Sequence, residues 1–208
     1  MATPDIVVIG ASAGGVQTLS ELVSRLPADF AASIFVVSHI PPYSPSALPS
    51  VLARSGNLPA TFGVDGDAIL PGQIYVAPPD HHMMVEFDKV RVVRGPKENR
   101  FRPSIDPLFR SAAYAFGPRV IGIILSGMLD DGTAGLWLIK DRGGIAIVQE
   151  PEEALCPAMP QSVLNHVDVD YRLSISEIAQ TLIHLIGASS LYDTEPRPIS
   201  RQSEMLEG

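Results

Sequence analysis

A candidate nucleophile stands close to the amino terminus, in the sequence Gly10-Ala11-Ser12-Ala13-Gly14, which matches the pattern G-x-S-x-G. The motif lies where an apolar run ends and a helical pattern begins. A tight turn there would lift the hydroxyl of Ser12 clear of a sheet, and the free N–H groups at the helix start would face an oxyanion. The alternative is a glycine-rich turn that cradles a phosphate, and the motif alone does not decide between the two.

Two more polar side chains could complete a site around Ser12. His39 directly follows one predicted strand, and Asp130 and Asp131 follow another. Because the carboxyl ends of parallel strands meet at one edge of a sheet, we expect these side chains to lie together. The histidine would take the serine proton and return it to the leaving group, while a carboxylate fixes the imidazole tautomer. The residues alone leave either aspartate open, since Asp130 could instead cap a following helix.

Nucleotide-binding motifs fit the sequence less well. A dinucleotide fingerprint needs glycine where Ser12 stands and a carboxylate after the second strand, where the chain has Ser38-His39. A Walker loop needs a Lys-Ser/Thr pair, which is missing after Gly14. These mismatches favour the serine hydrolase interpretation over a phosphate cradle.

Metal and disulfide chemistry are also disfavoured. Asp80-His81-His82 lacks a third ligand, and neighbouring residues in a strand point to opposite faces, so we predict a solvated turn there. Cys156 is the only cysteine, which excludes an intrachain disulfide and a cysteine-built metal site. We expect no metal and no cofactor.

The elements that would position these residues alternate between strand and helix. Continuous apolar runs, typical of strands buried on both faces, cover 5–10, 33–38, 120–125 and 144–149. Helical patterns cover 16–26, 46–54, 105–116 and 134–141. This alternation predicts an α/β fold with a doubly wound, mainly parallel sheet and helices on both faces.

Two segments depart from this alternation. Residues 73–93 contain short strands separated by turn residues, which predicts an antiparallel hairpin extension at one margin of the sheet. A last helix is predicted over 174–186, where Ser174 and Glu177 form a capping-box pattern. We therefore expect one catalytic domain over residues 1–187 and a flexible tail over 188–208.

Composition limits the classes of partner that this chain could bind. The chain has 208 residues and a net charge of -8, and its Lys and Arg residues form no cluster in the sequence, which argues against nucleic acid as a partner. No apolar run approaches the roughly 18 residues that span a bilayer, and no signal peptide opens the sequence. We expect a cytoplasmic protein without direct membrane insertion.

Six segments, in order, resemble the catalytic domain of the chemotaxis response-regulator protein-glutamate methylesterase (CheB-type) family. The similarity covers almost everything from Asp5 to Ile186. The segments are IGASAGG (9–15), SHIPP (38–42), YVAPPDHH (75–82), RPSIDPLF (102–109), SGMLDDGTAGL (126–136) and CPAMPQSV (156–163). Several motifs in register are far more specific than G-x-S-x-G alone.

The resemblance implies roles for individual residues. It places the family's nucleophile on Ser12, its histidine on His39 and its aspartate on Asp131, the aspartate directly before glycine. It implies a doubly wound parallel sheet with a short antiparallel extension. The implied reaction is hydrolysis of glutamate methyl esters on methyl-accepting chemoreceptors, which releases methanol, with deamidation of receptor glutamines as a second activity. The expected partner is such a chemoreceptor or another methylated signalling protein.

The resemblance also points to the oxyanion donors and to departures from the family. Backbone N–H groups of Met128 and of Ala13 or Gly14 are the expected donors. Ala13 stands where members often carry Thr or Ser, and Leu129-Asp130 replaces the more usual Gly-Asn. We therefore expect altered substrate preference.

The family's receiver domain would precede the first predicted strand, which begins here at Asp5. We therefore expect a stand-alone methylesterase that is not regulated by phosphorylation in cis. Two alternatives stay open. A general small-ester hydrolase is disfavoured because α/β-hydrolases order their triad as Ser, acid, His, whereas this chain has Ser, His, Asp. A catalytically silent interaction module would not need the three polar residues.

Overall fold

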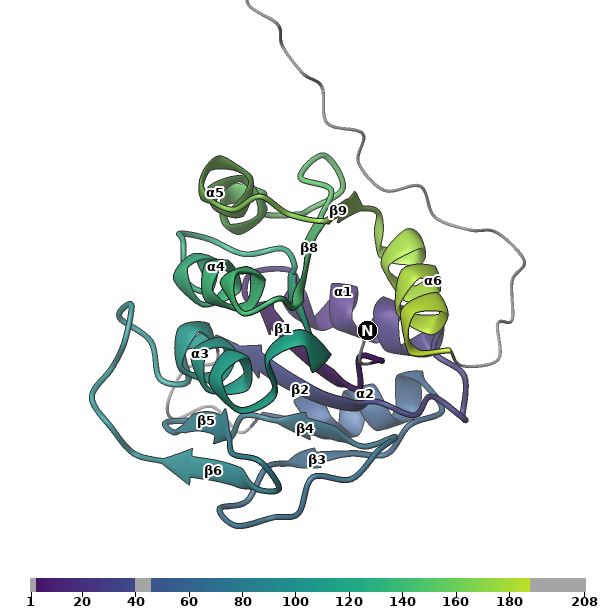
Figure 1. Ribbon diagram of the computed structural model, residues 1–208, viewed down its shortest axis with the longest axis vertical. Helices are drawn as coiled ribbons and strands as arrows, with labels where there is room; N and C mark the ends of the chain where they lie inside the picture. Colours follow the sequence, from purple (N-terminus) through teal and green to yellow (C-terminus); the bar gives the residue numbers. More distant parts are fainter. Residues whose placement is uncertain (1–2, 40–45, 188–208) are drawn as a thin grey trace, which may run out of the picture.

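Seven parallel strands form the central sheet (Figure 1). The computed structural model describes residues 3–39 and 46–187. The strands are β1 (Ile6–Ala11), β2 (Ser33–Ser38), β3 (Ala60–Phe62), β4 (Ile74–Val76), β7 (Val120–Ile124), β8 (Ile145–Gln149) and β9 (Tyr171–Leu173). Their order in the sheet is β3-β4-β2-β1-β7-β8-β9, and every pairing is parallel. The predicted α/β class and doubly wound sheet are confirmed.

Helices cover both faces of this sheet (Figure 1). One layer contains α1 (Gly15–Ser24), α2 (Leu48–Ser55) and α6 (Ile175–Ile186), and the other contains α3 (Ile105–Phe116), α4 (Thr133–Asp141) and α5 (Ala158–His166). A 3-10 turn, η1 (Gly117–Arg119), leads into β7. Each layer buries its own apolar cluster, because strand residues alternate: Val7 and Ile9 face one cluster, and Ile6 and Val8 face the other.

The antiparallel extension is smaller than predicted. Strands β5 (His82–Val85) and β6 (Val90–Val93) form a separate two-stranded sheet that packs against α3. The first part of the predicted extension, β4, instead pairs in parallel with β2 and β3 inside the main sheet. All three residues of β4 are buried, so such a short strand carries no alternation that would reveal its neighbours.

Three elements were not predicted from the sequence: β3, β9 and α5. Each is short, and the two strands have three residues each. The predicted tail at 188–208 lies outside the described residues. Among the residues that the structure describes, no helix combines the length and the apolar character needed to cross a membrane.

The order of the strands determines where the site lies. Strand β1 has β2 on one side and β7 on the other, and Ala11 is paired with Ser38 while Gly10 is paired with Ile124. The three strands therefore end at nearly the same level. Residues that follow β1, β2 and β7 meet at this edge, where ligands bind in doubly wound sheets.

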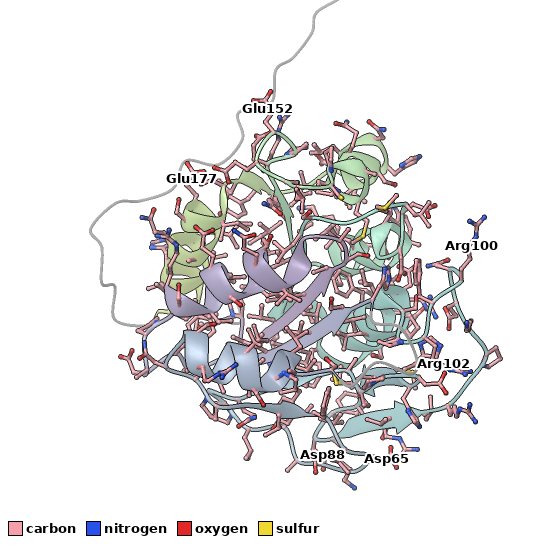
Figure 2. All side chains as sticks on the ribbon, turned by 180° about the vertical axis from the view of Figure 1, so that it is seen from behind. Asp65, Asp88, Arg100, Arg102, Glu152 and Glu177 are labelled. Carbon is pink, nitrogen blue, oxygen red and sulfur yellow. The ribbon has the colours of Figure 1, made fainter. Side chains whose placement is uncertain are left out.

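The start of α6 provides a test of local stability. The Oγ of Ser174 accepts a hydrogen bond from the Glu177 N–H, and the Glu177 carboxylate accepts one from the Ser174 N–H. Glu177 lies at the rim of the molecule (Figure 2). We expect Ser174→Ala to lower the free energy of unfolding by about 1 kcal/mol in urea titrations. The control Ser20→Ala, which removes an exposed hydroxyl from α1, should change it by less than about 0.5 kcal/mol.

Candidate active site

Ser12 stands in the turn between β1 and α1. Its N–H donates to the Ser126 carbonyl over 2.9 Å, and its own carbonyl accepts from the Gly15 N–H over 2.8 Å. The left-handed backbone of this turn lies at Gly14, with a φ of 79°, and not at Ser12. A glycine, which accepts this conformation readily, therefore takes the left-handed position of the turn. In an α/β-hydrolase nucleophile elbow the serine itself is strained.

The imidazole of His39 contacts this serine. Its Nδ1 lies 3.0 Å from the Ser12 Oγ, and its side chain is only 5% exposed. Phe101 stacks on a face of the ring, with 3.6 Å between the centroids and 6° between the planes. The backbone N–H of His39 donates to the Ala11 carbonyl over 3.3 Å. Stacking and hydrogen bonding together hold the ring in one orientation.

The other ring nitrogen of His39 contacts Asp131. Its Nε2 lies 2.7 Å from the Asp131 Oδ2, and the aspartate side chain is fully buried. With a carboxylate as its neighbour, Nε2 carries the proton, so Nδ1 is left to accept the proton of Ser12. The structure thus brings Ser12, His39 and Asp131 into one hydrogen-bonded chain. Asp130, the competing aspartate, is exposed.

The carboxylate of Asp131 sits at the amino-terminal end of α3. It accepts hydrogen bonds from the Ile105 N–H over 2.8 Å, from the Asp106 N–H over 3.2 Å and from the Ser104 hydroxyl over 2.9 Å. Unpaired amides and the helix dipole both favour an anion at this position. Asp131 therefore supplies the acceptor that the start of α3 needs, and α3 in turn stabilises its charge.

These contacts decide the charge of Asp131. Burial alone would raise the pKa of the carboxyl group, but hydrogen bonds from His39, from the Ile105 N–H and from Asn99 hold the pKa of Asp131 below its usual value. The carboxylate is therefore ionised at neutral pH. An ionised, buried acceptor beside Nε2 is what a histidine needs in order to become positively charged during proton transfer.

Several residues of this network were not predicted from the sequence. No role was predicted for Asn99, Phe101 or Ser104, although Ser104 lies within the RPSIDPLF segment. The prediction of a solvated turn was wrong for His82. His82 is 3% exposed, its Nε2 lies 2.7 Å from the Pro96 carbonyl, and its Nδ1 accepts from the Ser104 N–H over 3.3 Å. This histidine therefore contacts the backbone of Ser104, the residue directly before α3.

Residues 7–182 match the family model described as CheB methylesterase. The chain belongs to the CheB methylesterase family. It is 37% identical over 182 residues to a protein of Leptospira interrogans, covering 87% of this chain and 94% of that protein. It is 35% identical over 187 residues to a Trichodesmium erythraeum protein named protein-glutamate methylesterase/protein-glutamine glutaminase. That match covers 88% of this chain and 53% of the relative, so the chain spans about half of the relative's length.

A solved structure supports the same assignment. The crystal structure of the Thermotoga maritima CheB methylesterase catalytic domain superposes with a TM-score of 0.83 at 33% identity, covering 88% of this chain and all of that domain. The family and enzyme class expected from the motifs are thereby confirmed, and so is the fold.

The expected oxyanion donors belong to the turn after β1 and the loop after β7. Ser126 ties the turn around Ser12 to the next loop, because its hydroxyl donates to the Ala13 carbonyl over 2.8 Å and accepts from the Cys156 N–H over 2.9 Å. Within residues 3–39 and 46–187, the amides of Ala13, Gly14 and Met128 donate to no protein acceptor. These three N–H groups therefore remain candidates for holding an oxyanion.

The departure at Leu129 has a structural consequence. Leu129 has a φ of 67°, in the left-handed region that favours glycine, and its side chain is exposed. A non-glycine residue there costs about 1 to 2 kcal/mol. Leu129 therefore adds an apolar, strained rim beside Met128.

No metal site accompanies the triad in the part of the chain that the structure describes. No group of three or more His, Cys, Asp or Glu side chains there could hold a metal ion. The chemistry available at this site is that of a hydroxyl, an imidazole, a carboxylate and free backbone amides.

Gly127 offers a test of how closely the loop after β7 packs on Ser12. A Cβ added to Gly127 would overlap the Sδ of Met159 and lie 2.9 Å from the Cβ of Ser12. We expect Gly127→Ala to lower the free energy of unfolding by about 1 to 3 kcal/mol in urea titrations. Gly95→Ala is the matched control, since its Cβ would meet only His82, at 3.8 Å. Equal effects of the two substitutions would contradict this packing.

The lowered pKa of Asp131 predicts how stability depends on pH. A carboxyl group whose pKa is lower in the folded state stabilises the protein above its unfolded pKa and loses that contribution as the pH falls. We expect Asp131→Asn to cost about 3 kcal/mol at pH 7. The difference from wild type should shrink as the pH drops below 3.8, the unperturbed value. Urea titrations from pH 7 to pH 3 measure it, and a difference that grows on acidification would contradict the assignment.

Proposed function

We propose that this chain hydrolyses glutamate methyl esters on methyl-accepting chemoreceptors, with Ser12, His39 and Asp131 as a catalytic triad. Deamidation of receptor glutamines at the same site is part of the proposal. The observation that carries it is the hydrogen-bonded chain of 3.0 Å from Ser12 to His39 and 2.7 Å from His39 to Asp131. The names of the relatives support protein-bound glutamate esters and glutamines as substrates, and the resemblance to the CheB-type family supports chemoreceptors as the proteins that carry them. We propose residues 1–187 as the catalytic domain.

The first half of the reaction transfers the acyl group to the enzyme. The Oγ of Ser12 attacks the ester carbonyl carbon while its proton moves to the Nδ1 of His39. The carbonyl oxygen becomes an oxyanion, held by the amides of Met128 and of Ala13 or Gly14. When the tetrahedral intermediate collapses, the C–O bond to the methoxy group breaks. The leaving methoxide takes the proton from His39 and departs as methanol.

The second half regenerates the serine. A water molecule gives a proton to His39 and attacks the acyl carbon, and the new tetrahedral intermediate expels the Oγ of Ser12, which takes the proton back. The product is a free glutamate carboxylate. With glutamine as substrate, ammonia leaves in place of methanol and the same product forms.

Asp131 supports both halves through His39. Its charge stabilises the imidazolium that exists while the proton is on the ring, and its contact with Nε2 keeps Nδ1 turned toward Ser12. Phe101 limits rotation of the ring about its side-chain bonds. Removal of the carboxylate would leave the wrong tautomer populated.

Methanol release from a methylated chemoreceptor fragment tests the proposal. We expect Ser12→Ala and His39→Ala each to lower the rate by about a thousandfold or more, since members of a triad act as a unit. Ser20→Ala, a serine substitution on the exposed side of α1, should leave the rate unchanged. Equal methanol release by wild type and Ser12→Ala would contradict the proposal.

A second arm distinguishes the alternatives. Wild type that cleaves small aryl esters but releases no methanol from the receptor fragment is a general esterase, and wild type inactive on both is a silent module. Either result rejects the chemoreceptor assignment.

A further inference from the structure

The tight turn over residues 98–101 lies beside the triad. Glu98 and Phe101 exchange two backbone hydrogen bonds of 3.1 and 2.8 Å, and the two central residues, Asn99 and Arg100, have φ angles of 48° and 73°. Two left-handed residues in succession are the pattern of a type I′ turn. Asn tolerates the left-handed region, whereas an Arg there raises the free energy of the folded state. Contacts elsewhere must therefore hold the turn in place.

The inward contacts come from Asn99 and Phe101. Phe101 stacks on His39, as described above. The amide nitrogen of Asn99 lies 2.7 Å from the Asp131 Oδ1 and 2.7 Å from the Asp106 Oδ2. Its two hydrogens therefore point at two different carboxylates. Arg100 lies at the tip of the turn and its side chain extends away from the molecule (Figure 2).

The two carboxylates bridged by Asn99 are both buried, with 1% exposure for Asp131 and 5% for Asp106. Burial, together with the charge of Asp131, raises the pKa of Asp106, while the pKa of Asp131 is lowered. His39 and the Ser104 hydroxyl also face Asp131. The Gly135 N–H donates to Asp106 over 2.7 Å, and Arg110 acts on Asp106 by its charge.

Asn99 also lies between Asp131 and open space. It lines a cavity of about 460 Å³, together with Asp106, Asp130, Trp137 and His166. Asp131 is not among the residues that line this cavity. The Asn99 side chain thus stands between the cavity and the carboxylate that contacts His39.

We propose that Asn99 is a positioning residue of this enzyme, whose amide holds Oδ1 of Asp131, the oxygen that His39 does not contact, and separates the charge of Asp131 from that of Asp106. Without the amide, two negative charges would face each other across a gap that water can enter. Asp131 would then turn from His39 or take up a proton. The inference concerns the reactivity of Ser12, so it rests on the proposed triad but not on the chemoreceptor substrate.

Three variants test it without forcing the backbone. Asn99→Gly deletes the amide, and glycine accepts the left-handed backbone at this position. Asn99→Asp keeps the shape but replaces the donor by a third carboxyl group, and Asp also tolerates this backbone. Arg100→Gly, at the neighbouring position of the same turn, is the matched control. The readouts are the pH dependence of Ser12 labelling by a fluorophosphonate and of methanol release from the receptor fragment.

We expect Asn99→Gly to lower kcat about 10- to 100-fold, the effect of one lost hydrogen bond to a charged group, with KM changed less than about twofold. The acid limb of its labelling rate should move to higher pH, because the pKa of Asp131 rises when a hydrogen bond to its charged form is lost. Asn99→Asp should be slower still at neutral pH. Arg100→Gly should keep the wild-type profile.

Two results would overturn the inference. One is a labelling profile of Asn99→Gly that is scaled equally at all pH values, as expected if the side chain only supports the fold. The other is wild-type reactivity of Asn99→Asp, as expected if the Asn99 side chain only fills space. Shifted labelling profiles in an enzyme that releases no methanol would instead uphold the role of Asn99 and reject the chemoreceptor substrate.

Discussion

The site depends on one buried negative charge, the carboxylate of Asp131 at the amino-terminal end of α3. Such a charge is costly in a protein interior unless donors surround it. Here the first amides of α3, the Ser104 hydroxyl and the His39 ring supply them. The same contacts orient the imidazole. The arrangement that stabilises the charge of Asp131 therefore also holds His39 in position beside Ser12. Loss of the carboxylate would leave a histidine and a helix start without their acceptor.

The sheet brings the partners of this carboxylate together. Because β1 lies between β2 and β7, the residues after these strands converge from three separate parts of the chain. Ser126 then links the serine turn to the loop that leads into α5, through the Ala13 carbonyl and the Cys156 amide. Hydrogen bonds thus fix the turn around Ser12 on both sides, and precise attack geometry in a hydrolytic site needs such support.

The sequence predicted the parts of the fold that repeat a pattern. Continuous apolar runs revealed the four longest strands of the sheet, and strand ends placed Ser12, His39 and an aspartate at one edge. Short strands such as β4 have too few residues to show a periodic pattern of apolar and polar residues, and their neighbours in the sheet come from distant segments. The irregular loop between β6 and α3 contains Asn99 and Phe101, and His82 contacts it from β5. No spacing rule applies to such a loop. Their roles follow only from contacts across that loop.

Trapping the acyl-enzyme tests the central claim, that Ser12 is the nucleophile activated by His39 and Asp131. Wild type would be mixed with an excess of an activated aryl ester, quenched in acid during the first turnover, digested and mapped by mass spectrometry. The account predicts one acyl group per chain, on the peptide that contains Ser12. Steady turnover with an acyl group on another residue, or with none, would contradict it.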